Sequence, residues 1–486
     1  MRLRHLLSII LLAGCTSLRD TRLDHRLPLP EPVSIDLSRY RPVQERADGQ
    51  DPDLALVVAI SGGGHRAANF AIGVLLALEN LEIEGRHIDL LREVDYLSTS
   101  SGGGFAAGLY ISSLYDHLKA NNNDRAGYSL AKSLAANEAR LRQDLRRDYT
   151  GTIFEGMISP IVHGSIDGGD FLEKKLNRFI LGAAYREGGA SITMGNIFRD
   201  KENPLPVALP YWVPNATIYE NGQRFPFTPG ILKHYGVTGC THQLKSLEIR
   251  NNPYHMPLSI GMKASASFPV LFPATTLACN PSKDPLNPYL HLLDGGLSDN
   301  MGLYTAMELL KQDPAPRKVL LLIDAYNKVQ HPYSKIQRAP SKAESGYRTL
   351  SIVLDRDHAQ LDENLDKAKR LAEIEGGTPI STLRLGFDDI RPAITSQITD
   401  IENHLEELSK KKQKAIKQRI LNEINILLNR KQEELRHKQD TFSLYYNARN
   451  VFTSLYIMKG EQDLLLEAGQ AVVEKNWETI KSIIKN

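Results

Sequence analysis

Residues 54–66 read LALVVAISGGGHR, so seven apolar residues lead directly into a serine and three consecutive glycines. The apolar run is continuous and does not alternate with polar residues, which is typical of a strand buried on both faces of a sheet. A helix is expected from Ala67 to Leu81. Open α/β sheets carry their functional groups where strands end, so the glycines at 62–64 form a first candidate site.

Two more predicted strands end in polar, glycine-rich turns. Residues 98–103 read STSSGG and follow the segment 94–97, and a helix is expected from Gly103 to about Tyr115. Residues 294–296 read DGG and follow the segment 290–293, and another strand is predicted at 319–323. Strands that alternate with helices in this way predict a parallel α/β sheet.

Composition sets limits on what the protein is. The chain has 486 residues, 42% of them hydrophobic, which allows one large domain with an appendage and a substantial core. The net charge of +2 gives no case for nucleic-acid binding. No apolar stretch reaches the length of roughly 18 residues that a membrane-spanning helix needs.

The three motifs, in this order, resemble those of the patatin-like phospholipases, which are serine acyl hydrolases with a Ser–Asp dyad. The resemblance covers about Leu54 to Asn327 and includes PYWVPNAT at 210–217 and ASASFP at 264–269. It implies a patatin-like three-layer α/β fold with a central, mainly parallel sheet, extended here by a helical C-terminal region. The implied activity is hydrolysis of acyl esters of phospholipids or lysophospholipids, of phospholipase A or lysophospholipase type.

The resemblance implies that Ser100 is the nucleophile. Aligning Gly102 and Gly103 with the family pattern Gly-x-Ser-x-Gly-Gly places Ser100 at the reactive position, with Ser98 where the pattern has its leading glycine. Ser98 and Ser101 are rival nucleophiles. In this register Ser101 lies on the first turn of the following helix, with its backbone amide directed at the oxyanion.

The resemblance implies that Asp294 is the base. A base must lie within hydrogen-bond reach of the nucleophile, so a distance of roughly 2.6–3.2 Å between the two side chains is expected. The tripeptide DGG also occurs at 167–169, but Asp167 precedes a helical pattern and is expected to act as a turn and capping residue. A histidine base is the other alternative, and four histidines are candidates for it: His65, His255, His291 and His358.

The oxyanion is expected to bind at Gly62, Gly63 and Gly64, whose amides can approach a developing negative charge closely. Arg66 follows them and is expected either to bind the phosphate of the substrate, to orient the loop, or to be purely structural. A nucleotide-phosphate loop is the rival reading of the glycines, but no Gly-Lys-Ser/Thr pattern follows. No cofactor and no metal are expected, since neither His-Glu-x-x-His nor paired-Cys spacing occurs.

The N-terminus has the pattern of a bacterial lipoprotein signal. Arg2 and Arg4 precede the apolar segment 6–12, and the sequence Leu12-Ala13-Gly14-Cys15 is similar to a lipobox. Cys15 is therefore the expected lipid anchor to a membrane surface, and an ordinary secretory signal is the alternative. Thr16 follows Cys15, where an aspartate would favour the inner membrane, so an outer-membrane location in a bacterial envelope is expected.

Five regions are expected along the chain. They are a signal peptide (1–14), a membrane tether (15–50), a catalytic domain (51–385), a long helical or coiled-coil-like insertion (386–440) and closing helices (441–486). In the insertion, isoleucines and leucines recur at helical spacing from Ile394, which predicts a helix against the catalytic domain or an intermolecular coiled coil. The closing helices are expected at about 441–458 and 463–484.

Two expectations depend less directly on the motifs. Cys240 and Cys279 remain after processing, and a disulfide between them is predicted for an exported protein.

A different class of function is a non-enzymatic envelope lipoprotein with a degenerate patatin fold, which binds a partner through its helical C-terminal region. Reaction with a fluorophosphonate separates the two classes, because only an activated serine is labelled.

Replacing the predicted anchor gives the first test. Cys15→Ala should abolish incorporation of labelled palmitate and release the protein from the membrane fraction, because no acyl chain then holds it at the bilayer. Palmitate labelling together with fractionation of the cells measures both effects. Labelling and membrane association that both persist in the variant would contradict the lipoprotein hypothesis.

Overall fold

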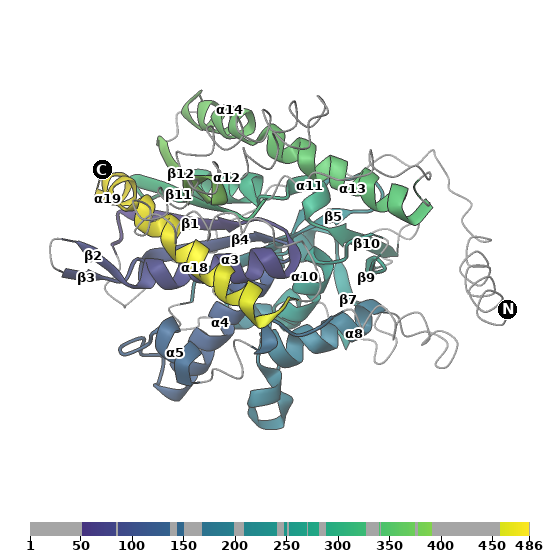
Figure 1. Ribbon diagram of the computed structural model, residues 1–486. Helices are drawn as coiled ribbons and strands as arrows, with labels where there is room; N and C mark the ends of the chain where they lie inside the picture. The colour runs from purple at the N-terminus through teal and green to yellow at the C-terminus, as the bar shows by residue number, and fades with distance from the viewer. Residues whose placement is uncertain are drawn as a thin grey trace, which may run out of the picture. The chain divides into compact units, whose positions relative to one another are not determined.

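The structure is a computed structural model in which a ten-stranded mixed sheet forms the centre (Figure 1). The strand order is β12-β11-β1-β4-β5-β10-β9-β7-β8, and β6 pairs with β5 outside this path. All described residues belong to the compact unit Val33–Asn486. They are residues 51–83, 86–136, 143–149, 168–198, 209–240, 247–249, 252–269, 271–280, 288–326, 340, 342–374, 378–390 and 457–485.

One half of the sheet is parallel, and it begins with the apolar run recognised in the sequence. This run forms β1, which pairs in parallel with β11 on one side and with β4 on the other. All seven β1 side chains are buried, as expected for a strand covered on both faces. The parallel strands are β12 (Ile380–Gly386), β11 (Arg317–Asp324), β1 (Leu54–Ile60), β4 (Val94–Ser100) and β5 (Tyr211–Ile218).

The other half is antiparallel and starts at β5, which has parallel β4 on one edge and antiparallel β10 on the other. A separate two-stranded sheet is formed by β2 (Leu81–Ile83) and β3 (Arg86–Ile88). The antiparallel strands of the main sheet are β10 (Tyr289–Asp294), β9 (Thr275–Cys279), β7 (Val237–Cys240), β8 (Leu247–Glu248) and β6 (Arg224–Pro226).

Helices lie on both sides of the sheet, which gives three layers (Figure 1). On one side are α3 (Gly64–Glu79), α4 (Gly103–Ala120), α5 (Leu130–Ala136), α10 (Leu258–Ser265) and α18 (Lys459–Lys475). On the other side are α11 (Gly296–Asp299), α12 (Leu303–Gln312), α13 (Lys342–Ala359) and α14 (Leu361–Ile374). The remaining helices are α8 (Gly168–Lys175), α9 (Pro229–His234) and α19 (Trp477–Lys485), and single short turns of 3₁₀- or π-helix connect several elements.

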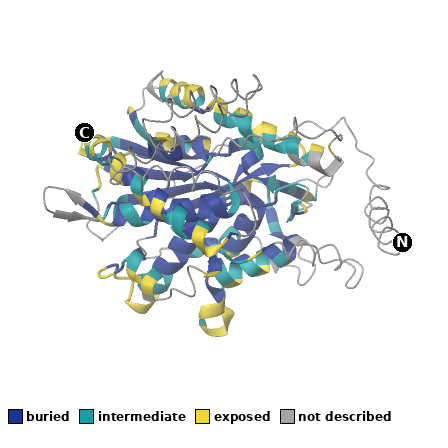
Figure 2. Cartoon of the chain, viewed as in Figure 1, coloured by how far each residue is buried: buried dark blue, intermediate teal, exposed yellow. Residues whose placement is uncertain are grey.

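Burial is greatest at the sheet and at the helix faces turned towards it, as Figure 2 shows. The helix α3 is buried along almost its whole length, whereas its neighbour α5 exposes one face. The reason is that α18 covers the outer side of α3. The C-terminal segment is therefore part of the core of the catalytic domain.

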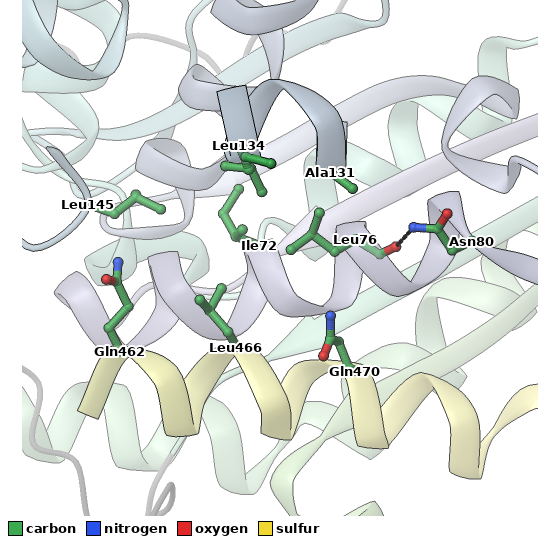
Figure 3. A pocket seen from close by; sticks show the side chains of 10 residues that line it. Ile72, Leu76, Asn80, Ala131, Leu134, Leu145, Gln462, Leu466 and Gln470 are labelled. Atoms are coloured by element: carbon green, nitrogen blue, oxygen red, sulfur yellow. Dashed lines mark hydrogen bonds between the residues drawn. The ribbon is translucent and has the colours of Figure 1, made fainter. Parts of the chain in front are cut away.

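The contact between α3 and α18 is a close approach of two backbones. A Cβ on Gly73 of α3 would collide with the backbone of Leu466, and a Cβ on Gly469 of α18 would collide with the carbonyl of Phe70. Small residues at a crossing let two helices approach closely. A cavity of about 380 Å³ remains beside this contact, where α5 faces α3 and α18 (Figure 3). Its walls are formed mainly by aliphatic side chains, among them Ile72, Leu134 and Leu466.

The structure confirms the predicted fold class, an α/β sheet between layers of helices with a helical C-terminal region. Within it, the strand that leads to Asp294 is antiparallel to β5, because the chain enters this edge from the opposite end of the sheet. The helix expected at 463–484 is two helices, α18 and α19, which are separated at Asn476. Cys15, the tether and nearly all of the predicted insertion at 386–440 lie outside the described residues.

The predicted disulfide is not present. Cys240 pairs with Leu277 in the sheet and Cys279 pairs with Val237, so the two cysteines do not stand opposite each other. Both side chains are buried and not bonded to each other, and the Cys240 thiol donates to the carbonyl of Thr276 at 3.3 Å. Among the helices that the structure describes, none is long and apolar enough to cross a bilayer.

The crossing of α3 and α18 can be tested with one methyl group. Gly73→Ala should lower the free energy of unfolding by about 1–3 kcal/mol, because the added Cβ meets the Leu466 backbone, which has no side-chain freedom to yield. Gly460→Ala is the matched control in α18: nothing lies within 4 Å of its Cβ, so stability should be unchanged or raised by up to about 1 kcal/mol. Urea unfolding of the two variants measures both, and equal effects would contradict the packing described.

Candidate active site

The site lies where β4 and β10 end on the two edges of the same strand, β5. In the parallel register Ser100 at the end of β4 pairs with Asn215, and in the antiparallel register Asp294 at the end of β10 pairs with Ala216. The strands β4 and β10 run in opposite directions along β5, and they end beside adjacent residues of it. The groups that follow β4 and β10 are thereby brought together above one point of the sheet.

Gly295 lets the chain cross β5 towards β4. A Cβ at this position would collide with the carbonyl oxygen of Asn215 and would lie 3.3 Å from the Ser100 hydroxyl. Because only hydrogen fits there, the backbone passes directly over β5 at Asn215, the fifth of its eight residues. The segment 294–300, which contains Asp294 and α11, is thereby placed against the turn that follows β4.

Ser101, not Ser100, contacts the predicted base. The hydroxyl of Ser101 donates a hydrogen bond of 2.8 Å to Oδ2 of Asp294. Ser101 has φ of 49°, a left-handed conformation that is costly for a residue with a side chain. It stands between β4 and α4, and this strained strand–turn–helix geometry is that of a nucleophile elbow.

The prediction that Ser100 contacts Asp294 is wrong. Ser100 is the last residue of β4, its side chain is fully buried, and its hydroxyl donates to the backbone carbonyl of Asp299 at 2.5 Å. This bond ties the end of β4 to the segment that carries Asp294. Ser100 is therefore a structural neighbour of the dyad.

The error came from the register of the serine and glycine run. If Ser101 is the elbow residue, the pattern reads Thr99-x-Ser101-x-Gly103, with Thr99 at the leading position. The Thr99 hydroxyl accepts a hydrogen bond from the indole of Trp212 at 2.9 Å. Ser98 lies further back in β4 and donates to the carbonyl of Gly302 at 2.7 Å, so neither rival, Ser98 nor Ser100, reaches Asp294.

Asp294 is a buried carboxylate with two hydrogen-bond donors. It is 2% exposed, and besides Ser101 it receives the backbone amide of Gly296 on Oδ1 at 2.8 Å. Burial raises the pKa of Asp294 to about 7, although the bonds from Gly296 and Ser101 act in the opposite direction. A carboxylate whose pKa lies near neutrality is a much better proton acceptor than an exposed one.

The glycine loop leads into the N-terminus of α3 beside Ser101. Gly63 and Gly64 have φ of 141° and 57°, which residues with side chains rarely adopt. The amide of Gly62 donates to the carbonyl of Asn300 at 2.9 Å and is not available to a ligand. Within the described part of the chain, the amides of Gly63 and Gly64 donate to no backbone carbonyl, so both are left available to a ligand.

The elbow and the glycine loop are pressed together. A Cβ on Gly102 would collide with the backbone of Gly64, and a Cβ on Gly62 would lie 3.3 Å from the Cβ of Ser101. The amide of Ser101, which was expected to face the oxyanion, donates instead to the hydroxyl of Ser265 in α10 at 2.9 Å. The amide of Ser101 is therefore engaged within the protein.

Arg66 faces the protein interior. It is 4% exposed, and its Nε donates to the carbonyl of Ala325 at 2.9 Å, just after β11. One of its terminal nitrogens lies 3.4 Å from the position of a Cβ on Gly63. These contacts support the loop-orienting role among the three alternatives and give no contact through which Arg66 binds substrate.

The histidines make other contacts, and none bonds to Ser101. Three of them contact groups away from Ser101 and Asp294: His65 contacts the Arg147 carbonyl, His291 the Thr276 hydroxyl, and His358 the carboxylate of Asp324. His255 lies in an exposed turn beside Asn252. Asp167 lies outside the described residues. In the part of the chain that is described, no three His, Cys, Asp or Glu side chains gather as a metal site requires.

Asp299 and Asn300 connect the base segment to its surroundings. The Asp299 carboxylate accepts from the amides of Leu303 and Tyr304 at 2.9 Å and so caps α12. Burial raises the pKa of Asp299 to about 6, and Arg224 opposes this rise. The carbonyl of Asn300 holds Gly62. The sequence motif SDN at 298–300 was the signal for these contacts, but spacing alone does not say which backbone groups they meet.

The comparisons with known proteins can be set beside this geometry. The family profile described as patatin-like phospholipase matches residues 58–307, more than half of the chain. No curated protein sequence is similar enough to count as a match.

Solved structures similar to this chain include human GIVD cytosolic phospholipase A2, with 11% identity, a TM-score of 0.42, and coverage of 91% of this chain and 62% of that one. The same human enzyme in complex with methyl gamma-linolenyl fluorophosphonate gives 11% identity, a TM-score of 0.43, and coverage of 91% and 60%. This chain therefore spans about 60% of the length of those structures. On the family match, the chain belongs to the patatin-like phospholipases.

Proposed function

We propose that the protein is a serine hydrolase of lipid acyl esters in which Ser101 is the nucleophile and Asp294 the base. The observation that carries this proposal is the 2.8 Å hydrogen bond from Ser101 to Asp294, made by a serine held at φ of 49°. A serine that is both strained and paired with a buried carboxylate has the features of an activated nucleophile.

In the first half of the reaction, Ser101 Oγ attacks the ester carbonyl carbon while its proton moves to Oδ2 of Asp294. The carbonyl oxygen becomes an oxyanion, and the amides of Gly63 and Gly64 donate to it at the N-terminus of α3. One such donor contributes about 3–4 kcal/mol in other serine hydrolases. Asp294 then returns the proton to the departing alkoxide, and the acyl group remains on Ser101.

In the second half, a water molecule takes the place of the alcohol. Asp294 accepts a proton from the water, whose oxygen attacks the acyl carbon, and the oxyanion forms again at the same amides. When the intermediate collapses, the proton returns to Ser101 and the fatty acid leaves. The same carboxyl thus serves as base and acid in both halves, as a dyad without histidine requires.

The substrates proposed are phospholipids or lysophospholipids, and this follows from the family to which the chain belongs. A lipid anchor at Cys15 would hold the enzyme at a membrane surface, which is the surface that presents such substrates. Analysis of the products released from phospholipid, lysophospholipid and neutral ester would identify the preferred class. The alternative function, a non-enzymatic lipoprotein, is less well supported, because a degenerate fold has no reason to retain a strained serine against a buried aspartate.

Substitution of the two adjacent serines separates the two candidate nucleophiles. Ser101→Ala should lose at least about 10³-fold in ester hydrolysis and all labelling by a fluorophosphonate, since no hydroxyl then faces Asp294. Ser100→Ala keeps the dyad and loses only its bond to the Asp299 carbonyl, so labelling should persist and activity should fall by about tenfold or less.

Labelling is detected by mass spectrometry of the modified peptide, and circular dichroism confirms that both variants are folded. If Ser101→Ala were labelled at Ser100 and still hydrolysed esters, the assignment of the nucleophile would be wrong. If neither the natural chain nor Ser100→Ala reacted with the fluorophosphonate, the result would support the non-enzymatic alternative.

The pH dependence of hydrolysis gives an independent test of the base. Below its pKa Asp294 carries a proton and cannot accept another, so kcat/KM should rise with pH and level off above a midpoint near 7. Measurement between pH 5 and 9 with an uncharged ester avoids titration of the substrate. Asp294→Asn should remove both the activity and the transition, and a midpoint near 4 would show that Asp294 is not desolvated in the working enzyme.

A further inference from the structure

The segment ASASFP at 264–269 contacts both residues of the proposed dyad but is not used by the proposed mechanism. It begins in the last turn of α10 and continues beyond the end of that helix. All eight residues of α10 are buried, and Lys263 forms an ion pair of 3.2 Å with Asp170 in α8, in which both side chains are 4% exposed. The segment therefore starts from a helix that is fixed in the core.

The backbone of this segment holds the base. The carbonyl of Ser265 accepts from the amide of Gly295 at 3.1 Å, and the carbonyl of Ser267 accepts from the amide of Asp294 at 3.0 Å. Carbonyls in the last turn of a helix have no partner within the helix, so the amide of Gly295 satisfies one that the helix itself leaves open. Two backbone hydrogen bonds thus tie the base to the end of α10.

The side chain of Ser265 holds the proposed nucleophile. Its hydroxyl accepts from the amide of Ser101 at 2.9 Å, and the side chain is fully buried. The direction of an N–H bond and the φ torsion of the same residue change together, so this hydrogen bond helps to keep Ser101 at φ of 49°. A strained conformation of this kind persists only where the surrounding structure fixes it.

We propose that Ser265 is a positioning residue, which holds Ser101 and Asp294 in hydrogen-bonding contact from one point at the end of α10. This inference rests on the proposed acyl-hydrolase function. The Ser265 hydroxyl orients the backbone of the nucleophile, and the Ser265 carbonyl fixes the backbone beside the base. Ser265 acts through Ser101 and Gly295 and takes no part in the proton transfer.

The variant Ser265→Ala removes the acceptor of the Ser101 amide and keeps the backbone bond to Gly295. For a substrate ester, kcat should fall about 10- to 10²-fold, because a displacement of about 1 Å in a catalytic group has an effect of this size. KM should change by less than about threefold, since Ser265 is buried and acts on the nucleophile. The rate of fluorophosphonate labelling at Ser101 should fall by about the same factor as kcat.

Ser259→Ala is the matched control in the same helix. Ser259 lies six residues before Ser265 and is also fully buried, but its hydroxyl bonds to the carboxylate of Glu173 in α8. Each variant therefore loses one buried hydroxyl from α10, whereas only Ser265 bonds to the proposed nucleophile. For Ser259→Ala, kcat and the labelling rate should stay within about threefold of the natural chain.

The pH dependence of kcat/KM separates positioning from a general loss of stability. Burial raises the pKa of Asp294, and the hydrogen bonds from Gly296 and Ser101 oppose that rise. If Ser101 turns away from Asp294 in Ser265→Ala, one of these bonds is weakened and the pKa rises further. The midpoint of kcat/KM should then lie at a higher pH than in the natural chain, whereas Ser259→Ala should keep the natural midpoint.

Each outcome decides the question. A kcat for Ser265→Ala within about threefold of the natural chain would overturn the proposal, as would an unchanged midpoint or equal losses of kcat in Ser265→Ala and Ser259→Ala. If Ser265→Ala does not fold by circular dichroism, Ser265→Cys fills the same space with sulfur, a weak acceptor, and should show the same losses.

Two further results have distinct meanings. If neither Ser265 variant folds while Ser259→Ala does, Ser265 serves the fold and the proposal is wrong. If the natural chain neither hydrolyses esters nor reacts with the fluorophosphonate, the proposed function itself fails, and the inference about Ser265 fails with it.

Discussion

The active site depends on backbone segments that approach more closely than any side chain would allow. Gly102 of the elbow lies against the backbone of Gly64, and Gly295 lies against the carbonyl of Asn215. At both places a single methyl group would push the segments apart. The first contact sets the distance between the nucleophile and the oxyanion loop, and the second sets the distance between the nucleophile and its base. Catalytic groups must be placed to within about 0.5 Å, so a side chain at either glycine would disturb the geometry that the proposed reaction needs.

Mixed strand direction is the second condition. In an all-parallel sheet, the ends of neighbouring strands lie at one edge, side by side. Here β10 runs against β5, so Asp294 comes to the site from the side opposite to β4. The proposed nucleophile and base therefore meet across β5 at Asn215 and Ala216. One short segment, 294–300, carries both Asp294 and the carbonyl that holds Gly62.

Burial suits the carboxylate of Asp294 to the role proposed for it, that of the base, which is a histidine in many other serine hydrolases. Desolvation raises the pKa of Asp294 to about 7, close to that of an ordinary histidine. The cost of keeping this charge inside the protein is offset by donors from Gly296 and Ser101 and by the packing of the surrounding sheet. The C-terminal helix α18 contributes indirectly, because it covers α3, which begins directly after Gly62 and Gly63 of the glycine loop.

Local sequence was sufficient for four strands (β1, β4, β10 and β11), for the helices that follow the first two glycine turns, and for the family, because these follow from apolar runs and from residue types in a fixed order. It also identified Asp294, for which a buried strand and the DGG turn are both local signals. It did not decide between Ser100 and Ser101. The run STSSGGG at 98–104 fits the elbow pattern in two registers, and the choice depends on where β4 ends and which residue takes a positive φ. That point is set by the pairing of β4 with β5 and by the contact of Gly102 with Gly64, both of which join residues far apart in the chain. The same holds for the Gly62 amide, the direction of Arg66 and the position of Asn300: spacing names the residues, but only the tertiary structure decides which backbone groups are already occupied and which remain for a substrate.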